Sequence, residues 1–81
     1  MNIILKEQEC EGTSKFDSDM YMTKGFMNTF GDNFVEVIFK TMDLIKKRPN
    51  TDYFQVATCD GITYWIIDDI DHITFLLPDE Y

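Results

Sequence analysis

The residues best suited to bind a metal ion lie near the carboxyl end of the chain. Asp68, Asp69, Asp71 and His72 place three carboxylates and an imidazole within five consecutive positions, which is a ligand set for Mg²⁺, Mn²⁺ or Zn²⁺. The stretch lacks the glycine and the terminal glutamate of a calcium-binding loop. A solvated turn without a metal is the preferred interpretation, because aspartate favours turns.

The only thiols and the only imidazole in the chain form a second candidate, a zinc site. Cys59 and His72 are expected at opposite ends of one strand, roughly 20 Å apart at ~3.3 Å per residue. A mixed site that combines Cys10 with either residue and with nearby carboxylates stays open. Free thiols in a reducing compartment are the preferred interpretation. We therefore expect no cofactor, with zinc as the alternative.

No arrangement of residues in the sequence is typical of an enzyme. Ser14 and Ser18 have no neighbouring histidine, and the isolated glycines do not form a phosphate-binding loop. A small domain with one helix leaves little volume for a substrate pocket of about 300 Å³ or more. The sequence therefore predicts a protein without catalytic activity.

The chain is strongly acidic. Its 81 residues carry 15 Asp and Glu against 7 Lys and Arg, a formal net charge of −8, and no Lys or Arg follows Arg48. Direct binding to nucleic acid is disfavoured, because that affinity rests on Lys and Arg that neutralise phosphates. The basic surface of a nucleic-acid-binding protein or nuclease is the better electrostatic partner.

Length and hydropathy predict one folded domain, residues 1–81, in the cytoplasm. Hydrophobic residues make up 44% of the chain and aromatic residues 15%, which is enough for one small core. The first residues lack the basic start and the apolar run of a signal peptide. No segment approaches the ~20 apolar residues of a membrane span. We expect neither export nor membrane binding.

Hydrophobic periodicity predicts an α+β fold, in which one amphipathic helix packs on an antiparallel sheet of about 4–5 strands. The helix is expected at residues 32–47, capped by Thr29 or Asp32 and ended before Pro49. Its expected apolar stripe is Phe34, Val35, Ile38, Met42 and Ile45.

Alternating residues predict the strands of this sheet. They are expected at residues 2–8, 20–27, 53–59, 62–67 and 72–77. The Asp60-Gly61 dipeptide is a strong hairpin signal, and residues 68–71 are expected to form a second turn. The last three strands therefore form a carboxy-terminal three-stranded meander.

A single helix covers one face of such a sheet and leaves the other open. Aromatic residues on an open face, beside turn carboxylates, are typical of protein-binding surfaces. We therefore expect a partner-binding surface at the carboxyl end, with Tyr64 or Trp65 as its anchor. Its predicted residues are Asp68, Asp69, Asp71, Asp79, Glu80, Tyr64 and Trp65.

Two short stretches resemble a known family. YMTKGF (residues 21–26), followed by a helix and then TDYFQV (residues 51–56), is similar to a family of short uncharacterised proteins from Gram-positive bacteria and their mobile elements. The amino-terminal strand and the stretch from Trp65 to Tyr81 have no counterpart in that pattern. The resemblance implies an origin and a fold, and it brings no catalytic residues.

Size, charge and the lack of an active-site motif favour two functions. The first is a small acidic inhibitor, encoded by a phage or mobile element, that docks on a host nucleic-acid-handling protein and blocks its substrate channel. Small phage anti-CRISPR proteins against Cas9-type nucleases are similar in these respects. The alternative is a cytosolic protein–protein interaction module or homodimer without an inhibitory role.

Overall fold

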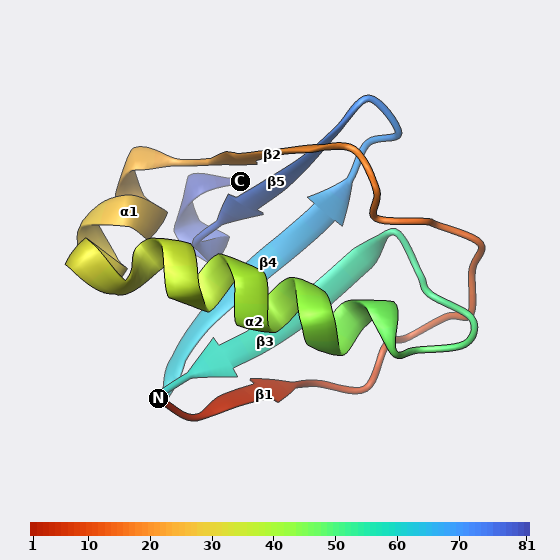
Figure 1. The fold of residues 1–81 in the computed structure, drawn as a ribbon, viewed down its shortest axis with the longest axis horizontal. Coiled ribbons are helices and arrows are strands. Elements are labelled where there is room, and N and C mark those ends of the chain that lie inside the picture. The colour runs from red at the N-terminus through yellow and green to blue at the C-terminus, as the bar shows by residue number, and fades with distance from the viewer.

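The computed structural model describes all 81 residues of the chain as an α+β fold. One five-stranded sheet has the strand order β1-β3-β4-β5-β2 (Figure 1). The strands are β1 (Ile3–Leu5), β2 (Asp19–Met22), β3 (Phe54–Cys59), β4 (Ile62–Asp68) and β5 (His72–Leu76). The expected meander of β3, β4 and β5 is confirmed, and β1 adds to it antiparallel beside β3.

The sheet differs from the expected antiparallel one at one edge. There β2 pairs in parallel with β5, with Met20 opposite Ile73 and Met22 opposite Phe75. The parallel pairing is sterically simple because a long segment separates the two strands, whereas a hairpin would force them antiparallel. The sheet is therefore mixed.

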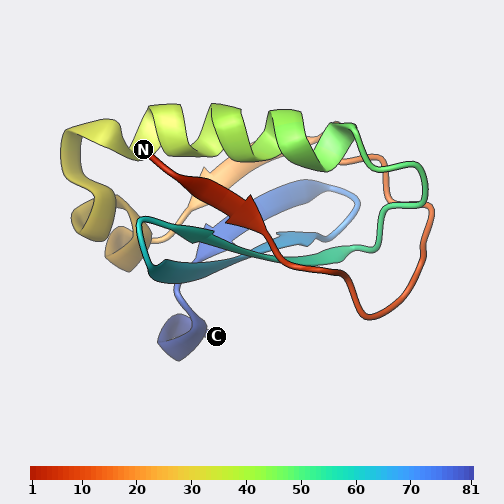
Figure 2. The ribbon, with the colours of Figure 1, turned by 90° about the horizontal axis from the view of Figure 1, so that it is seen from below.

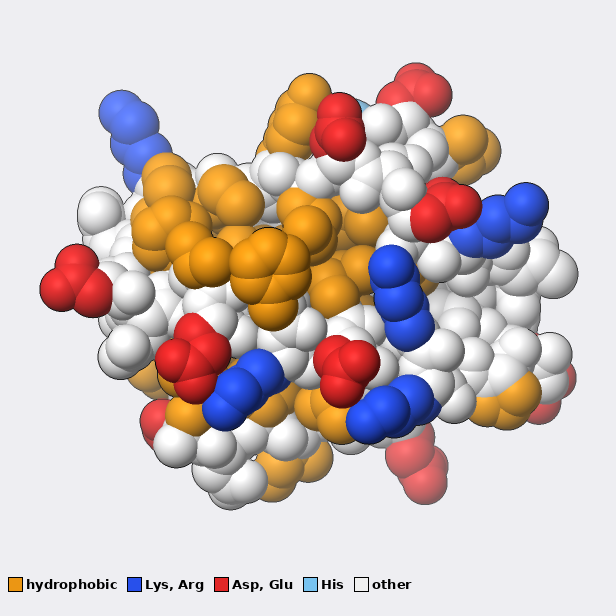
Figure 3. Space-filling view, viewed as in Figure 1, with side chains coloured by type: hydrophobic (Ala, Val, Ile, Leu, Met, Phe, Trp, Pro, Cys, Tyr) orange, Lys and Arg blue, Asp and Glu red, His pale blue; other side chains and the backbone are white.

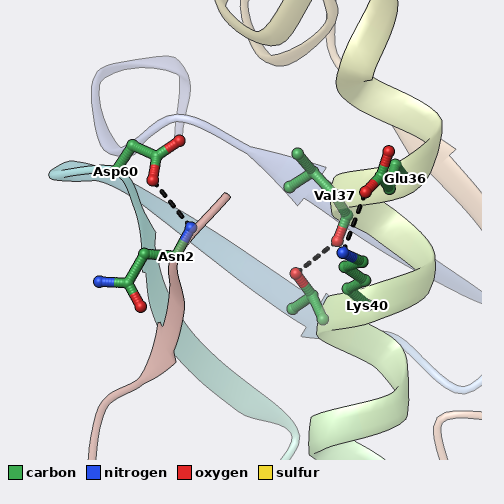
Figure 4. A network of polar contacts seen from close by, with 6 residues as sticks. Asn2, Glu36, Val37, Lys40 and Asp60 are labelled. Atoms are coloured by element: carbon green, nitrogen blue, oxygen red, sulfur yellow. Dashed lines mark hydrogen bonds and ion pairs between the residues drawn. The ribbon is translucent and has the colours of Figure 1, made fainter.

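The first hairpin of the meander has the turn that its sequence predicts. Asp60 has φ 51° and Gly61 has φ 86°, so both central residues of this two-residue turn are left-handed, as a type I′ turn requires. Asp60 also accepts a hydrogen bond through Oδ1 from the backbone N–H of Asn2, at 2.8 Å (Figure 4). This bond fastens the start of β1 to the turn.

Helical residues begin earlier than expected. The stretch predicted as a strand at 20–27 ends as β2 at Met22, and α1 (Lys24–Phe30) follows at once. Thr23 caps this helix, since its hydroxyl oxygen accepts a hydrogen bond from the N–H of Phe26 at 3.2 Å. Phe26 and Phe30, four residues apart, pack with ring centroids 4.9 Å apart.

The long helix, α2 (Phe34–Lys46), follows a single 3₁₀ turn, η1 (Gly31–Asn33), and covers one face of the sheet (Figure 2). Its exposed side carries two ion pairs between residues four apart, Glu36 with Lys40 at 3.0 Å (Figure 4) and Asp43 with Lys47 at 3.4 Å. Neither α1 nor α2 has the length and apolar character that a membrane-spanning helix needs.

The buried stripe of α2 is rotated from the expected one. Its buried residues are Val37, Ile38, Thr41, Met42 and Ile45. Val35, expected in the stripe, is 46% exposed, and Phe34 is only half-buried. Thr41 faces β4, since its hydroxyl lies 2.6 Å from that of Tyr64, and a count of apolar residues alone could not place this polar residue in the buried stripe. The core between helix and sheet is completed by Phe16, Phe26, Tyr64, Ile66, Ile73 and Phe75.

Candidate functional site

Tyr64, a predicted partner anchor, lies in the core. It is fully buried on the sheet face that α2 covers, and its hydroxyl lies 2.6 Å from Oγ1 of Thr41. Burial raises the pKa of Tyr64 to about 12, although the hydrogen bond with Thr41 acts against this rise. The expectation that Tyr64 is exposed as a partner anchor is therefore wrong, because its side chain is buried under α2.

Asp68, expected in an exposed turn, is the last residue of β4 and is 8% exposed. Its Oδ2 accepts a hydrogen bond from the N–H of Phe16 at 3.1 Å, and its Oδ1 accepts one from the N–H of Ile70 at 3.0 Å. Such bonds hold a buried carboxylate that would otherwise be costly. Asp68 therefore positions two loops, and its expected place on the exposed rim is wrong.

Asp69 and Asp71 are exposed in the β4–β5 turn, as expected. Oδ2 of Asp69 lies 3.5 Å from Nε2 of His72, whose ring stacks on Tyr21 with centroids 5.1 Å apart. Ile70, between the two aspartates, is 84% exposed and has φ 74°. This turn projects an acidic tip from the end of the sheet opposite the Asp60-Gly61 turn.

Asp79 and Glu80, both predicted to bind a partner, are exposed, but Glu80 forms hydrogen bonds within the chain. Its carboxylate accepts hydrogen bonds from the Thr23 hydroxyl, from the N–H of Leu77 at 2.9 Å and from the N–H of Gly25 at 3.0 Å. These bonds lower the pKa of Glu80, with the Thr23 hydroxyl as the largest cause. They fasten the final 3₁₀ turn, η2 (Pro78–Glu80), to the start of α1.

Trp65 lies on the face of the sheet that α2 does not cover. Its neighbours in β4, Tyr64 and Ile66, are buried under the helix, so the alternation of a strand turns Trp65 the opposite way. Its ring packs at 5.1 Å from that of Phe54 and at 5.5 Å from that of Tyr81. Figure 2 shows η2 on this same side of the sheet, away from α2.

A cleft of about 640 Å³ lies beside Trp65 on this open face. Its apolar floor is formed by Tyr53, Phe54, Val56 and Trp65, and the segment that follows β1 forms its wall. The charged side chains that line it are Glu7, Glu9, Asp52 and Lys6. The cleft thus combines aromatic rings with three carboxylates and a single ammonium group. We call it the Trp65 cleft.

A partly buried polar network holds the wall of the Trp65 cleft in place. Arg48 donates through Nη2 to the carbonyl oxygen of Lys6 at 2.6 Å and through Nη1 to Oε1 of Gln55 at 2.8 Å. Gln55, fully buried, donates through Nε2 to Oε1 of Gln8 at 2.7 Å, and the N–H of Asp52 donates to the same oxygen at 3.1 Å. The wall is therefore fixed by hydrogen bonds to α2's carboxyl end and to β3.

A second exposed apolar area lies on the helix side of the molecule. Val35 and Phe39 of α2 are 46% and 59% exposed, and Figure 3 shows apolar side chains gathered over this face beside the Lys and Glu side chains of the helix. Phe39 does not line the Trp65 cleft, so this area is a separate apolar surface.

The residues considered for a metal site are dispersed. Cys59 pairs with Ile62 at one end of β4, whereas His72 follows the turn at its other end, on the opposite sheet face. Cys10 is exposed and lines the Trp65 cleft. Burial raises the pKa of the Cys59 thiol, and the nearby Asp60 carboxylate adds to this. No group of three or more His, Cys, Asp or Glu side chains is placed to hold a metal ion.

Several cleft residues were not among the predicted site residues. The alternation of Phe54 and Val56 with the buried Gln55 and Ala57 is a sequence signal that puts the first two on the open face. The carboxylates of Glu7 and Glu9 give no such signal, because their segment is positioned by contacts of Gln8 with Arg48 and Gln55, which lie 40 and 47 residues further along the chain.

Comparisons with protein-family models, with curated proteins and with solved structures found no match to this chain.

Proposed function

We propose that this protein is a non-catalytic binding module that docks on a basic surface of another protein through the open face of its sheet. The observation that carries the proposal is the Trp65 cleft, in which exposed aromatic rings lie beside carboxylates. Tyr and Trp that are half-exposed on a rigid sheet are typical anchors of protein interfaces. Carboxylates around them attract a positive partner and repel a negative one.

The net charge of −8 supports a more specific target, a host protein that handles nucleic acid. Such proteins expose basic grooves that bind phosphates, and an acidic domain of this size fits over such a groove. In this proposal the protein is an inhibitor encoded by a phage or mobile element, acts in the host cytoplasm and blocks nucleic-acid access to a nuclease, as anti-CRISPR proteins against Cas9-type nucleases do.

The two edges of the sheet favour a second candidate, a homodimer. The outer edges of β1 and β2 have no strand partner, and Ile4 and Tyr21 on these strands are 53% and 57% exposed. Unpaired edges are templates for pairing with another chain. Light scattering over a range of protein concentrations separates this candidate from the first, since a dimer through these edges gives twice the monomer mass without any partner.

Photo-cross-linking from Cys10 tests the proposal, because Cys10 is exposed at the Trp65 cleft while Cys59 is buried. Benzophenone maleimide attached to Cys10 is expected to capture a basic nucleic-acid-binding protein from a Gram-positive host lysate. Raising the salt concentration should reduce the yield, because screening weakens attraction between exposed charges.

Matched variants locate the docking face. Tyr53 and Phe39 have nearly equal exposures, 56% and 59%. Tyr53 lines the Trp65 cleft, whereas Phe39 lies on α2. Tyr53→Ala should lower capture about tenfold, as expected for an interface anchor, and Phe39→Ala should not. The reverse ranking, or equal capture from a label placed at Lys47→Cys in a Cys10→Ser background, would assign docking to the helix side and overturn the proposed face.

A further inference from the structure

We infer that the Trp65 cleft binds an arginine side chain of a basic protein segment. This inference rests on the proposed function, because it names the group of the partner that the open face receives. It adds what that proposal leaves open, namely which cation enters the cleft and which surfaces of the cleft hold it.

The floor of the cleft suits a planar cation. Tyr53, Phe54 and Trp65 supply aromatic faces and edges, with Phe54 tilted at 58° to the ring of Trp65. A cation over an aromatic face is attracted by the ring quadrupole, and Trp gives the strongest such attraction. A guanidinium group also stacks flat on the ring and loses less hydration than an ammonium group does.

The rim of the cleft suits a hydrogen-bond donor with several N–H groups. Glu7, Glu9 and Asp52 line the cleft, and none of the three forms an ion pair within the chain. Lys6 is the one basic side chain that lines the cleft, and the guanidinium group of Arg48 behind the wall is engaged with Lys6 and Gln55. A guanidinium group can stack on an aromatic ring and donate in-plane hydrogen bonds to a carboxylate at the same time. Charge and shape therefore both favour arginine as the occupant.

The cleft is preorganised for this ligand. Arg48 and Gln55 hold the backbone of Lys6 and the side chain of Gln8, so the acidic wall stands at a fixed place above the aromatic floor. Gln55 is fully buried, so the network is anchored in the interior of the molecule. A wall that is already ordered reduces the entropy lost on binding. The volume of about 640 Å³ exceeds a single side chain and also admits neighbouring residues of an extended segment.

The chain carries its own probe, because Trp65 is its only tryptophan. We would follow Trp65 fluorescence while adding an acetylated and amidated Arg-Gly-Arg-Gly-Arg peptide, with lysine and citrulline versions as matched controls. Citrulline keeps the planar shape of arginine but has no charge. The arginine peptide should give a saturable change, the lysine peptide should bind about fivefold more weakly, and the citrulline peptide should not bind.

Two sets of variants separate local contacts from overall charge. Glu7→Gln/Glu9→Gln/Asp52→Asn should weaken binding of the arginine peptide about tenfold. The control variant Asp17→Asn/Asp32→Asn/Glu36→Gln changes the net charge by the same amount, but its three residues are exposed outside the cleft. It should have little effect on binding of the arginine peptide. Tyr53→Leu keeps the apolar volume and should weaken binding about threefold. Phe39→Leu is its control on α2.

Equal binding of the arginine and lysine peptides, or equal losses in the two triple variants, would overturn the inference. If the arginine peptide fails to bind while cross-linking from Cys10 still captures a partner that depends on Tyr53, the inference fails and the proposed function stands. If the peptide binds with the expected selectivity but no protein is captured, the arginine site stands and the proposed function fails.

Discussion

The carboxylate of Glu80 accepts a hydrogen bond from the hydroxyl of Thr23, which is the capping residue of α1. The same carboxylate also receives the N–H of Gly25, and a Cβ atom at Gly25 would lie 2.5 Å from the carboxylate carbon. A side chain at position 25 would therefore displace the Glu80 carboxylate from its place at the helix start. An anion here also complements the positive end of the helix dipole.

Replacing Glu80 by Gln should destabilise the protein at neutral pH and not at low pH. The folded state lowers the pKa of Glu80 from its ordinary value of 4.5, so the ionised carboxylate stabilises the fold. That stabilisation is fully present above pH 4.5 and is lost as the pH falls through the lowered pKa. Urea unfolding of both proteins at pH 7 and at pH 2.5 measures this. A constant difference between them at both pH values would contradict an ionic role.

The buried pair of Thr41 and Tyr64 gives a prediction about the core. Thr41→Val leaves the Tyr64 hydroxyl without its partner in a dry site, which should cost about 1–3 kcal/mol of unfolding free energy. Adding Tyr64→Phe removes the orphaned hydroxyl. The double variant should therefore be more stable than the sum of the single losses predicts. Strict additivity of the two losses in chemical denaturation would show that the pair is not coupled.

The two thiols should react at very different rates. Cys10 is exposed, whereas Cys59 is 2% exposed and its pKa is raised by burial. The thiolate is the reactive form, so both burial and the raised pKa protect Cys59. A disulfide reagent added at pH 8 should release one equivalent of chromophore promptly from the native protein and two from the protein in guanidinium. Cys10→Ser should abolish the prompt equivalent.

Ile70 occupies a strained position at the tip of the β4–β5 turn. Its φ of 74° is unfavourable for a β-branched residue. Ile70 is the central residue of a γ-turn, in which the N–H of Asp71 donates a hydrogen bond to the carbonyl oxygen of Asp69 at 2.8 Å. Ile70→Gly should raise the unfolding free energy by about 0.5–1 kcal/mol, because glycine adopts this conformation freely. Ile70→Ala keeps the Cβ and should not. Thermal unfolding of the three proteins compares them.

The sequence predicted those elements whose signals are local. The helix expected at 32–47 is α2 at Phe34–Lys46, and the Asp60-Gly61 turn is in place. The start of α1 was missed, although Thr23 followed by Phe26 and Phe30 is a capping residue before helical spacing. The parallel partner of β2 has no local signal, because β5 lies fifty residues further along the chain.

Trp65 lies on the open face of the sheet, as expected, whereas Tyr64 and Asp68 are buried and not exposed as expected. Adjacent aromatic residues in a strand face opposite ways, and Tyr64 is the one that turns inward, where Thr41 and the rings of Phe26 and Phe30 pack on it. The burial of Asp68 depends on the N–H of Phe16, which lies 52 positions earlier. Alternation thus predicts which side chains of a strand share a face, and long-range contacts determine which of the two faces is buried.

The pairing of β2 with β5 sets a limit on when this protein can fold during its synthesis. The strand at Asp19–Met22 leaves the ribosome early, but its only partner in the sheet is the last strand, His72–Leu76. Likewise β1 waits for β3. Strand β1 therefore stays unpaired until β3 has emerged, and β2 until β5 has emerged, so the sheet closes only after translation of β5.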